Sequence, residues 1–192
     1  VTEGGLVNVA TGTYTEALSI TKDLTLEGAG AGVSTIASPD TLPVCFTSSN
    51  DNKAIVCIED AEVTIDGFTI DGLSKGNPNY RFVGVAFHNA GGTLQNNEVI
   101  NIQDTPFSGA QHGNAVYAFN EDDIHRTINV LENEIADFQK TGIALNASDT
   151  TPLTVLVDGN VITGKGPTTV TAQNGVQVWA LLGDGTISNN AV

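Results

Sequence analysis

The chain has 192 residues, a length that suits one compact domain or a short solenoid. Seven basic residues stand against 22 acidic ones, and the net charge of −15 argues against nucleic acid and anionic membranes as partners, because phosphate binding needs clustered Lys and Arg. No apolar run approaches the roughly 20 residues of a bilayer-spanning helix, so we expect no membrane span in this chain.

Short β-type runs begin at residues 7–9 and recur along the whole chain. Many of them end on a bend made of an acidic or amide residue followed by Gly or Asn, and this pair recurs about every 30 residues. Gly and Asn best tolerate the left-handed backbone region, so the second residue of each pair predicts one bend of constant shape per repeat. The predicted bend residues are Gly28, Gly67, Asn97, Asn133, Gly159 and Asn190.

A second series of strands runs between the bends, at residues 84–87, 115–118, 142–145 and 175–178. Their alternation places one apolar set on a common face, and no helical period persists over three turns. Strands of this length with a repeat near 30 residues predict an all-β protein, a right-handed parallel β-helix (β-solenoid) of about six coils with ~30 residues per coil. A β-sandwich is the alternative, because it also joins short strands by turns.

The opening segment carries a family resemblance. Residues 7–9 read Val-Asn-Val, residues 12–16 read Gly-Thr-Tyr-Thr-Glu, and residues 20–30 read Ile-Thr-Lys-Asp-Leu-Thr-Leu-Glu-Gly-Ala-Gly. This succession, with later Asn bends such as residues 94–99, resembles the pectin lyase-like right-handed parallel β-helix superfamily. The resemblance implies the fold and leaves the activity open, because this superfold carries lyases, hydrolases, esterases, phage fibres and surface proteins.

Two cysteines, Cys45 and Cys57, flank a polar loop at residues 47–53. Their spacing predicts a disulfide, which suits a secreted or cell-surface protein. Two buried free thiols are the alternative. A zinc site is not expected, because two cysteines without a nearby His provide too few ligands.

The loops at residues 71–81, 103–113, 121–126 and 163–174 are expected to project from one side as a stack. The superfamily's lyases use calcium on carboxylates and an Arg or Lys base, so the resemblance implies calcium-binding carboxylates such as Asp71 and Asp104, with Arg81 or Lys75 as the base. The same stack of loops contains His112, and the candidate catalytic set, if the chain is an enzyme, is Asp71, Arg81, Asp104 and His112. Calcium accepts six to eight oxygen ligands. The candidate calcium ligands are Asp71, Asp104, Asp122 and Asp123. The cofactor prediction is therefore none, or calcium.

A pectinesterase motif, Gln-Asp-Thr, also occurs at residues 103–105, but the other parts of that family's site are missing and Trp179 has no Arg beside it. We read this match as chance.

These observations favour a non-enzymatic module with a structural, adhesion or assembly role and with carbohydrate binding as a further role. We expect residues 1–192 to form one domain of a larger surface protein. The expected partners are polysaccharide or neighbouring protein chains, and we expect the chains to contact residues 6–9 or residues 175–192. The alternative is a carbohydrate-active enzyme, a polysaccharide lyase or a pectinesterase- or glycosidase-like protein, acting on acidic polysaccharide. A chain of charge −15 repels polyuronates unless calcium or a local basic groove intervenes.

Overall fold

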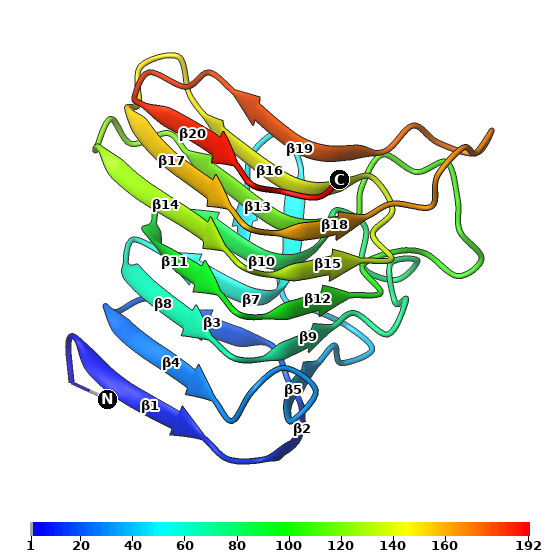
Figure 1. Ribbon diagram of the computed structural model, residues 1–192, viewed down its shortest axis with the longest axis horizontal. Helices are drawn as coiled ribbons and strands as arrows, with labels where there is room; N and C mark the ends of the chain where they lie inside the picture. Colours follow the sequence, from blue (N-terminus) through cyan, green and yellow to red (C-terminus); the bar gives the residue numbers. More distant parts are fainter. Residues whose placement is uncertain (1) are drawn as a thin grey trace.

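The computed structural model describes residues 2–192, and every regular element in that range is a β-strand. Apart from one short strand, the strands form three sheets in which neighbouring strands run parallel (Figure 1). Within the same range there is no helix long and apolar enough to cross a membrane.

The first sheet contains seven strands, in the order β1 (Gly5–Val9), β4 (Leu24–Gly28), β8 (Glu62–Asp66), β11 (Gly91–Gln95), β14 (Arg126–Leu131), β17 (Leu153–Asp158) and β20 (Gly185–Ser188). The second sheet contains six strands, in the order β2 (Gly12–Thr15), β5 (Ser34–Ala37), β9 (Thr69–Asp71), β12 (Glu98–Ile100), β15 (Glu134–Ala136) and β18 (Val161–Thr163).

The third sheet contains β3 (Leu18–Ile20), β7 (Asp51–Glu59), β10 (Phe82–His88), β13 (Asn114–Asn120), β16 (Thr141–Ala147) and β19 (Asn174–Trp179). A short additional strand, β6 (Phe46–Thr47), pairs antiparallel with the start of β7. The chain visits the three sheets in rotation, so that each strand lies beside its counterpart from the preceding passage (Figure 1).

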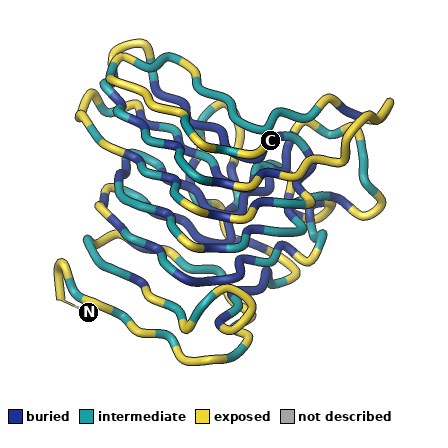
Figure 2. The backbone as a smooth tube through the Cα atoms, in the orientation of Figure 1, coloured by how far each residue is buried: buried dark blue, intermediate teal, exposed yellow. Residues whose placement is uncertain are grey.

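The core lies between the three sheets, where the buried positions gather in Figure 2. Alternation along each strand sends every second side chain inward. On neighbouring strands of the first sheet these positions coincide, and Ile65, Leu94 and Val130 form one fully buried column. The apolar alternation of the sequence is therefore what builds the core.

The corner between the first and second sheets corrects the predicted bend. The six predicted bend residues, from Gly28 to Asn190, do not share one position in the register of the first sheet but occupy two adjacent ones. Gly67, Gly159, Asn96, Glu132 and Asn189 share the first position and have positive φ between 54° and 75°. Gly28 lies at the same position without a positive φ. The predicted left-handed backbone at Asn97, Asn133 and Asn190 is wrong, because the left-handed residue is the one before each of them.

Those three asparagines, together with Asn160, form a ladder of side-chain hydrogen bonds. The Asn160 Oδ1 atom accepts the backbone N–H of Asn133 at 3.0 Å and its side-chain amide at 2.9 Å. The same arrangement links Asn97 to Asn133 and Asn160 to Asn190. Asn97, Asn133 and Asn160 are at most 2% exposed, so Asn is needed here because it partners buried backbone groups at the corner.

Candidate functional site

The predicted catalytic residues do not converge. Within residues 2–192, no hydrogen bond or ion pair joins any two of Asp71, Arg81 and Asp104. The Asp71 Oδ1 atom accepts the N–H of Leu73 and the amide of Asn101, each at 2.8 Å. Asp71 therefore stabilises the loop that follows it and its contact with the next passage of the chain.

Asp104 and His112 are the one pair of this set that the structure brings together. The His112 Nε2 atom lies 3.1 Å from Asp104 Oδ1, and both side chains are at most 5% exposed. The contact lies off the line of an ideal hydrogen bond, since Oδ1 has no partner by geometry. The N–H of Phe82 donates to His112 Nδ1 at 3.3 Å, which places the ring proton of neutral His112 on Nε2, facing Asp104.

The other oxygen of Asp104 is also occupied. Ser108 donates its hydroxyl to Oδ2, and Gln139 donates its side-chain amide to the same atom at 3.3 Å. Ser108 thus bonds to the carboxylate and not to the imidazole, so the three residues lack the nucleophile-to-base contact of a catalytic triad.

The four predicted calcium ligands do not form one group in the part of the chain that the structure describes. Asp122 accepts two hydrogen bonds from the Arg126 guanidinium, at 2.6 and 2.7 Å, and these bonds hold the pKa of the Asp122 carboxyl below its usual value. Asp123 accepts the hydroxyl of Thr150. No group of three or more His, Cys, Asp or Glu side chains in residues 2–192 is arranged to hold a metal ion. Each of these carboxylates therefore has a local structural partner.

A shallow groove lies on the outer face of the third sheet, and we call it the lateral groove. Its volume is about 170 Å³. Strands β13, β16 and β19 place Tyr117, Ala144 and Gln177 side by side in register. The full lining is Arg81, Gln111, Asn114, Tyr117, Lys140, Thr141, Ala144, Asn146 and Gln177.

The lateral groove differs in charge from the rest of the chain. It is lined by two cations, four amides and a phenol, with no carboxylate, in a protein of net charge −15. Two shielded polar atoms on its wall, Arg81 Nε and Asn146 Oδ1, have no partner. Burial raises the pKa of the Tyr117 phenol, while the nearby side chain of Asn146 opposes this shift. The groove therefore offers hydrogen-bond donors and acceptors beside an aromatic ring.

A disulfide-bonded hairpin lies beside the lateral groove and contacts Tyr117 and Arg81, which line it. Cys45 and Cys57 form the predicted disulfide, which fixes the segment carrying β6 to the outer face of β7. The ring of Phe46 stacks on His88 at 4.2 Å and lies 5.9 Å from the ring of Tyr117. Arg81 reaches the same hairpin through a 3.4 Å hydrogen bond to Ser49.

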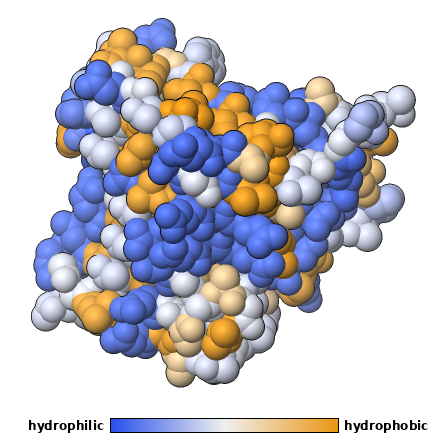
Figure 3. Space-filling view, in the orientation of Figure 1, coloured by the Kyte–Doolittle hydropathy of each residue, from blue (hydrophilic) through white to orange (hydrophobic). Residues whose placement is uncertain are grey.

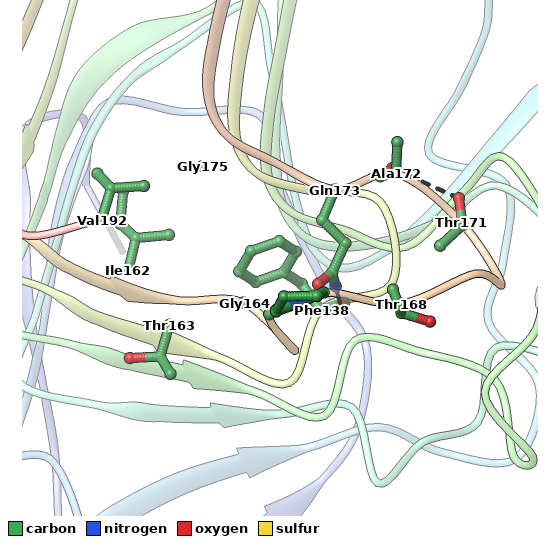
Figure 4. Close-up of a pocket in the computed structure, with 12 residues that line it drawn as sticks. Phe138, Ile162, Thr163, Gly164, Thr168, Thr171, Ala172, Gln173, Gly175 and Val192 are labelled. Atoms are coloured by element: carbon green, nitrogen blue, oxygen red, sulfur yellow. Dashed lines mark hydrogen bonds between the residues drawn. The ribbon is translucent and has the colours of Figure 1, made fainter.

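A larger hollow of about 620 Å³ lies beside β18, the loop that follows it and the C-terminal residue. Figure 4 shows Phe138, Ile162 and Val192 around it. Figure 3 shows hydrophobic residues gathered over the strands at the same end, where Ile187 and Val192 are 53% and 80% exposed. This hollow is apolar at its inner end and carries no charged side chain.

Sequence reasoning missed most of the lateral groove. Tyr117, Asn146 and Gln177 lie on strands whose apolar alternation predicts only the inward face. The outward positions of the same strands carried the signal, because polar and aromatic residues recur there in register.

A comparison with known proteins finds no matching family model, no matching curated protein and no matching solved structure. What the candidate site can do therefore follows from its geometry.

Proposed function

We propose that this chain is an extracellular module of a larger surface protein or assembly, and that it binds carbohydrate through the lateral groove without catalysing a reaction. We further infer that its three sheets form a right-handed parallel β-helix of about six coils, as in the pectin lyase-like superfamily. The rotation of the chain through the sheets and the asparagine ladder at one corner support this fold. The Cys45–Cys57 disulfide is compatible with an extracellular location.

The composition of the lateral groove carries the proposal. A sugar ring presents hydroxyl groups that both donate and accept, and the groove meets them with Arg81, Asn114, Asn146 and Gln177. Arg81 and Lys140 form the local basic surface that a chain of charge −15 needs to approach an acidic polysaccharide without calcium.

The test is binding of polygalacturonate and of a neutral glucan, measured by affinity electrophoresis and titration calorimetry. We expect wild-type protein to bind at least one of them, and Arg81→Ala and Lys140→Ala to weaken that binding. Lys22→Ala, which removes an exposed cation outside the groove, is the matched control. Failure to bind either polymer, or equal binding by Arg81→Ala, would contradict the proposal.

Enzymatic action is tested in the same samples. A lyase releases unsaturated product from polygalacturonate, and we expect none with or without added calcium. Product formed by wild type and lost in Arg81→Ala would establish the alternative, a carbohydrate-active enzyme.

A further inference from the structure

Asp104, His112 and Gln139 are buried, and with half-buried Ser108 they form what we call the loop cluster. None of the four lines the lateral groove. Gln139 is its centre: its Oε1 atom accepts the N–H of Asp104 at 2.9 Å, and its amide reaches Asp104, Ser108 and the carbonyl oxygen of Ala110. Buried side chains that are linked by several hydrogen bonds hold a loop in one conformation.

The loop cluster is joined by the main chain to three side chains of the groove. Arg81 precedes Phe82, whose N–H donates to His112. Gln111 precedes His112, and Lys140 follows Gln139. These three are long side chains, so their direction depends on how the backbone beneath them is held.

Backbone contacts tighten the same region. The N–H of Gly113 donates to the carbonyl oxygen of Phe82 at 3.2 Å. The N–H of Lys140 donates to the carbonyl oxygen of Gly113 at 3.0 Å. A Cβ atom at Gly113 would lie 2.6 Å from the Gln139 Cβ atom, so the two segments approach too closely for any other residue.

We propose that Asp104, Ser108, His112 and Gln139 are positioning residues, which hold Arg81, Gln111 and Lys140 in the arrangement that the lateral groove uses to bind its ligand. This inference rests on the proposed function of the groove. It also gives a role to the buried contact between Asp104 and His112.

The first test compares two substitutions of His112. Gln can place its amide N–H close to the position of Nε2, facing Asp104, whereas Leu provides no polar group. We expect His112→Leu to bind polygalacturonate, or the glucan if that is the polymer bound, roughly tenfold more weakly, and His112→Gln to restore most of the affinity. Equal affinity of wild type and His112→Leu would overturn the inference.

A double-mutant cycle separates positioning from general loss of stability. If His112 acts through Arg81, His112→Leu has a smaller effect on affinity in an Arg81→Gln background than in wild type. Full additivity would show that the loop cluster does not act through Arg81. Ser108→Ala, which removes one donor to Asp104, is a milder variant should His112→Leu fail to fold.

Hydrogen exchange tests the inference without any ligand. We expect His112→Leu, or Ser108→Ala in its place, to speed amide exchange at residues 81–82 and 111–114 by more than its effect on global stability, with little change in β8 and β11. Unchanged exchange, or an equal increase across the core, would overturn it. If the wild type binds no polymer but this pattern appears, the proposed function fails while the loop cluster is still shown to order the groove.

Discussion

At the scale of single residues, the asparagine ladder predicts a sharp contrast between two neighbouring positions. Asn160→Ala leaves the N–H of Asn133 buried without its partner and removes a hydrogen bond to the carbonyl oxygen of Val130, so we expect a loss of about 2 kcal/mol in the free energy of unfolding. Glu132→Gly changes a left-handed residue to the type that tolerates this backbone, and we expect a change near zero. Urea unfolding measures both.

Equal costs for the two substitutions would mean that backbone strain, and not the ladder, governs this corner.

The sequence pattern located this corner but misassigned its chemistry. Acidic or amide residues followed by Gly or Asn recur because each passage turns there, and both Gly67 and Asn97 belong to the corner. The sequence pattern combines two separate structural requirements of the corner. One is a residue with a left-handed backbone, and the other is a buried Asn side chain at the next position. Only the three-dimensional register separates them, because the loops between repeats differ in length.

At the scale of elements, the disulfide fixes β6 over the third sheet. The bridge spans a sequence separation of 12, and we expect Cys45→Ala/Cys57→Ala to lower the free energy of unfolding by roughly 2–3 kcal/mol. We also expect faster hydrogen exchange at residues 43–50, because Phe46 would lose its fixed place against His88.

Thiol titration of denatured, unreduced protein provides the independent check on this element. No titratable thiol is expected. Two titratable thiols would show that the bridge is absent in solution, and would remove one support for an extracellular location.

The sheets were predictable and the groove was not, for one physical reason. Inward positions repeat a single requirement, apolar volume, so the alternation of Val85 with Phe87 or Ile143 with Leu145 shows directly in the sequence. Outward-facing side chains form a binding site only when strands that are far apart in sequence pair and bring those side chains together. Tyr117, Ala144 and Gln177 share one row because of the register, which the sequence alone does not specify.

The dispersal of the predicted calcium ligands follows from the same cause. Asp71 ends β9, whereas Asp104 lies inside a loop whose path is set by Gln139 and His112. The two residues also lie at different distances from their bends, four residues past Gly67 for Asp71 and seven past Asn97 for Asp104. Loops therefore need the structure before their side chains can be grouped.

At the scale of the whole molecule, one inward column of the first sheet tests the assembly part of the proposed function. Val157 pairs with Ile187 in the column that also contains Ile65. Ile65 is fully buried and Ile187 is 53% exposed. In a monomer we expect Ile65→Ala to cost about 2–5 kcal/mol and Ile187→Ala about 1 kcal/mol, because less apolar area is buried at the second site.

Assembly through the edge of β20 changes that expectation in a concentration-dependent way. A chain that pairs with this edge binds only the folded state, so wild-type stability rises with protein concentration, and the cost of Ile187→Ala rises toward that of Ile65→Ala. Thermal unfolding over a hundredfold range of concentration, with sedimentation velocity on the same samples, measures both effects. A wild-type chain that sediments as a monomer throughout, with a constant melting temperature and a small constant cost for Ile187→Ala, would rule out self-assembly at this edge and leave carbohydrate binding as the remaining role.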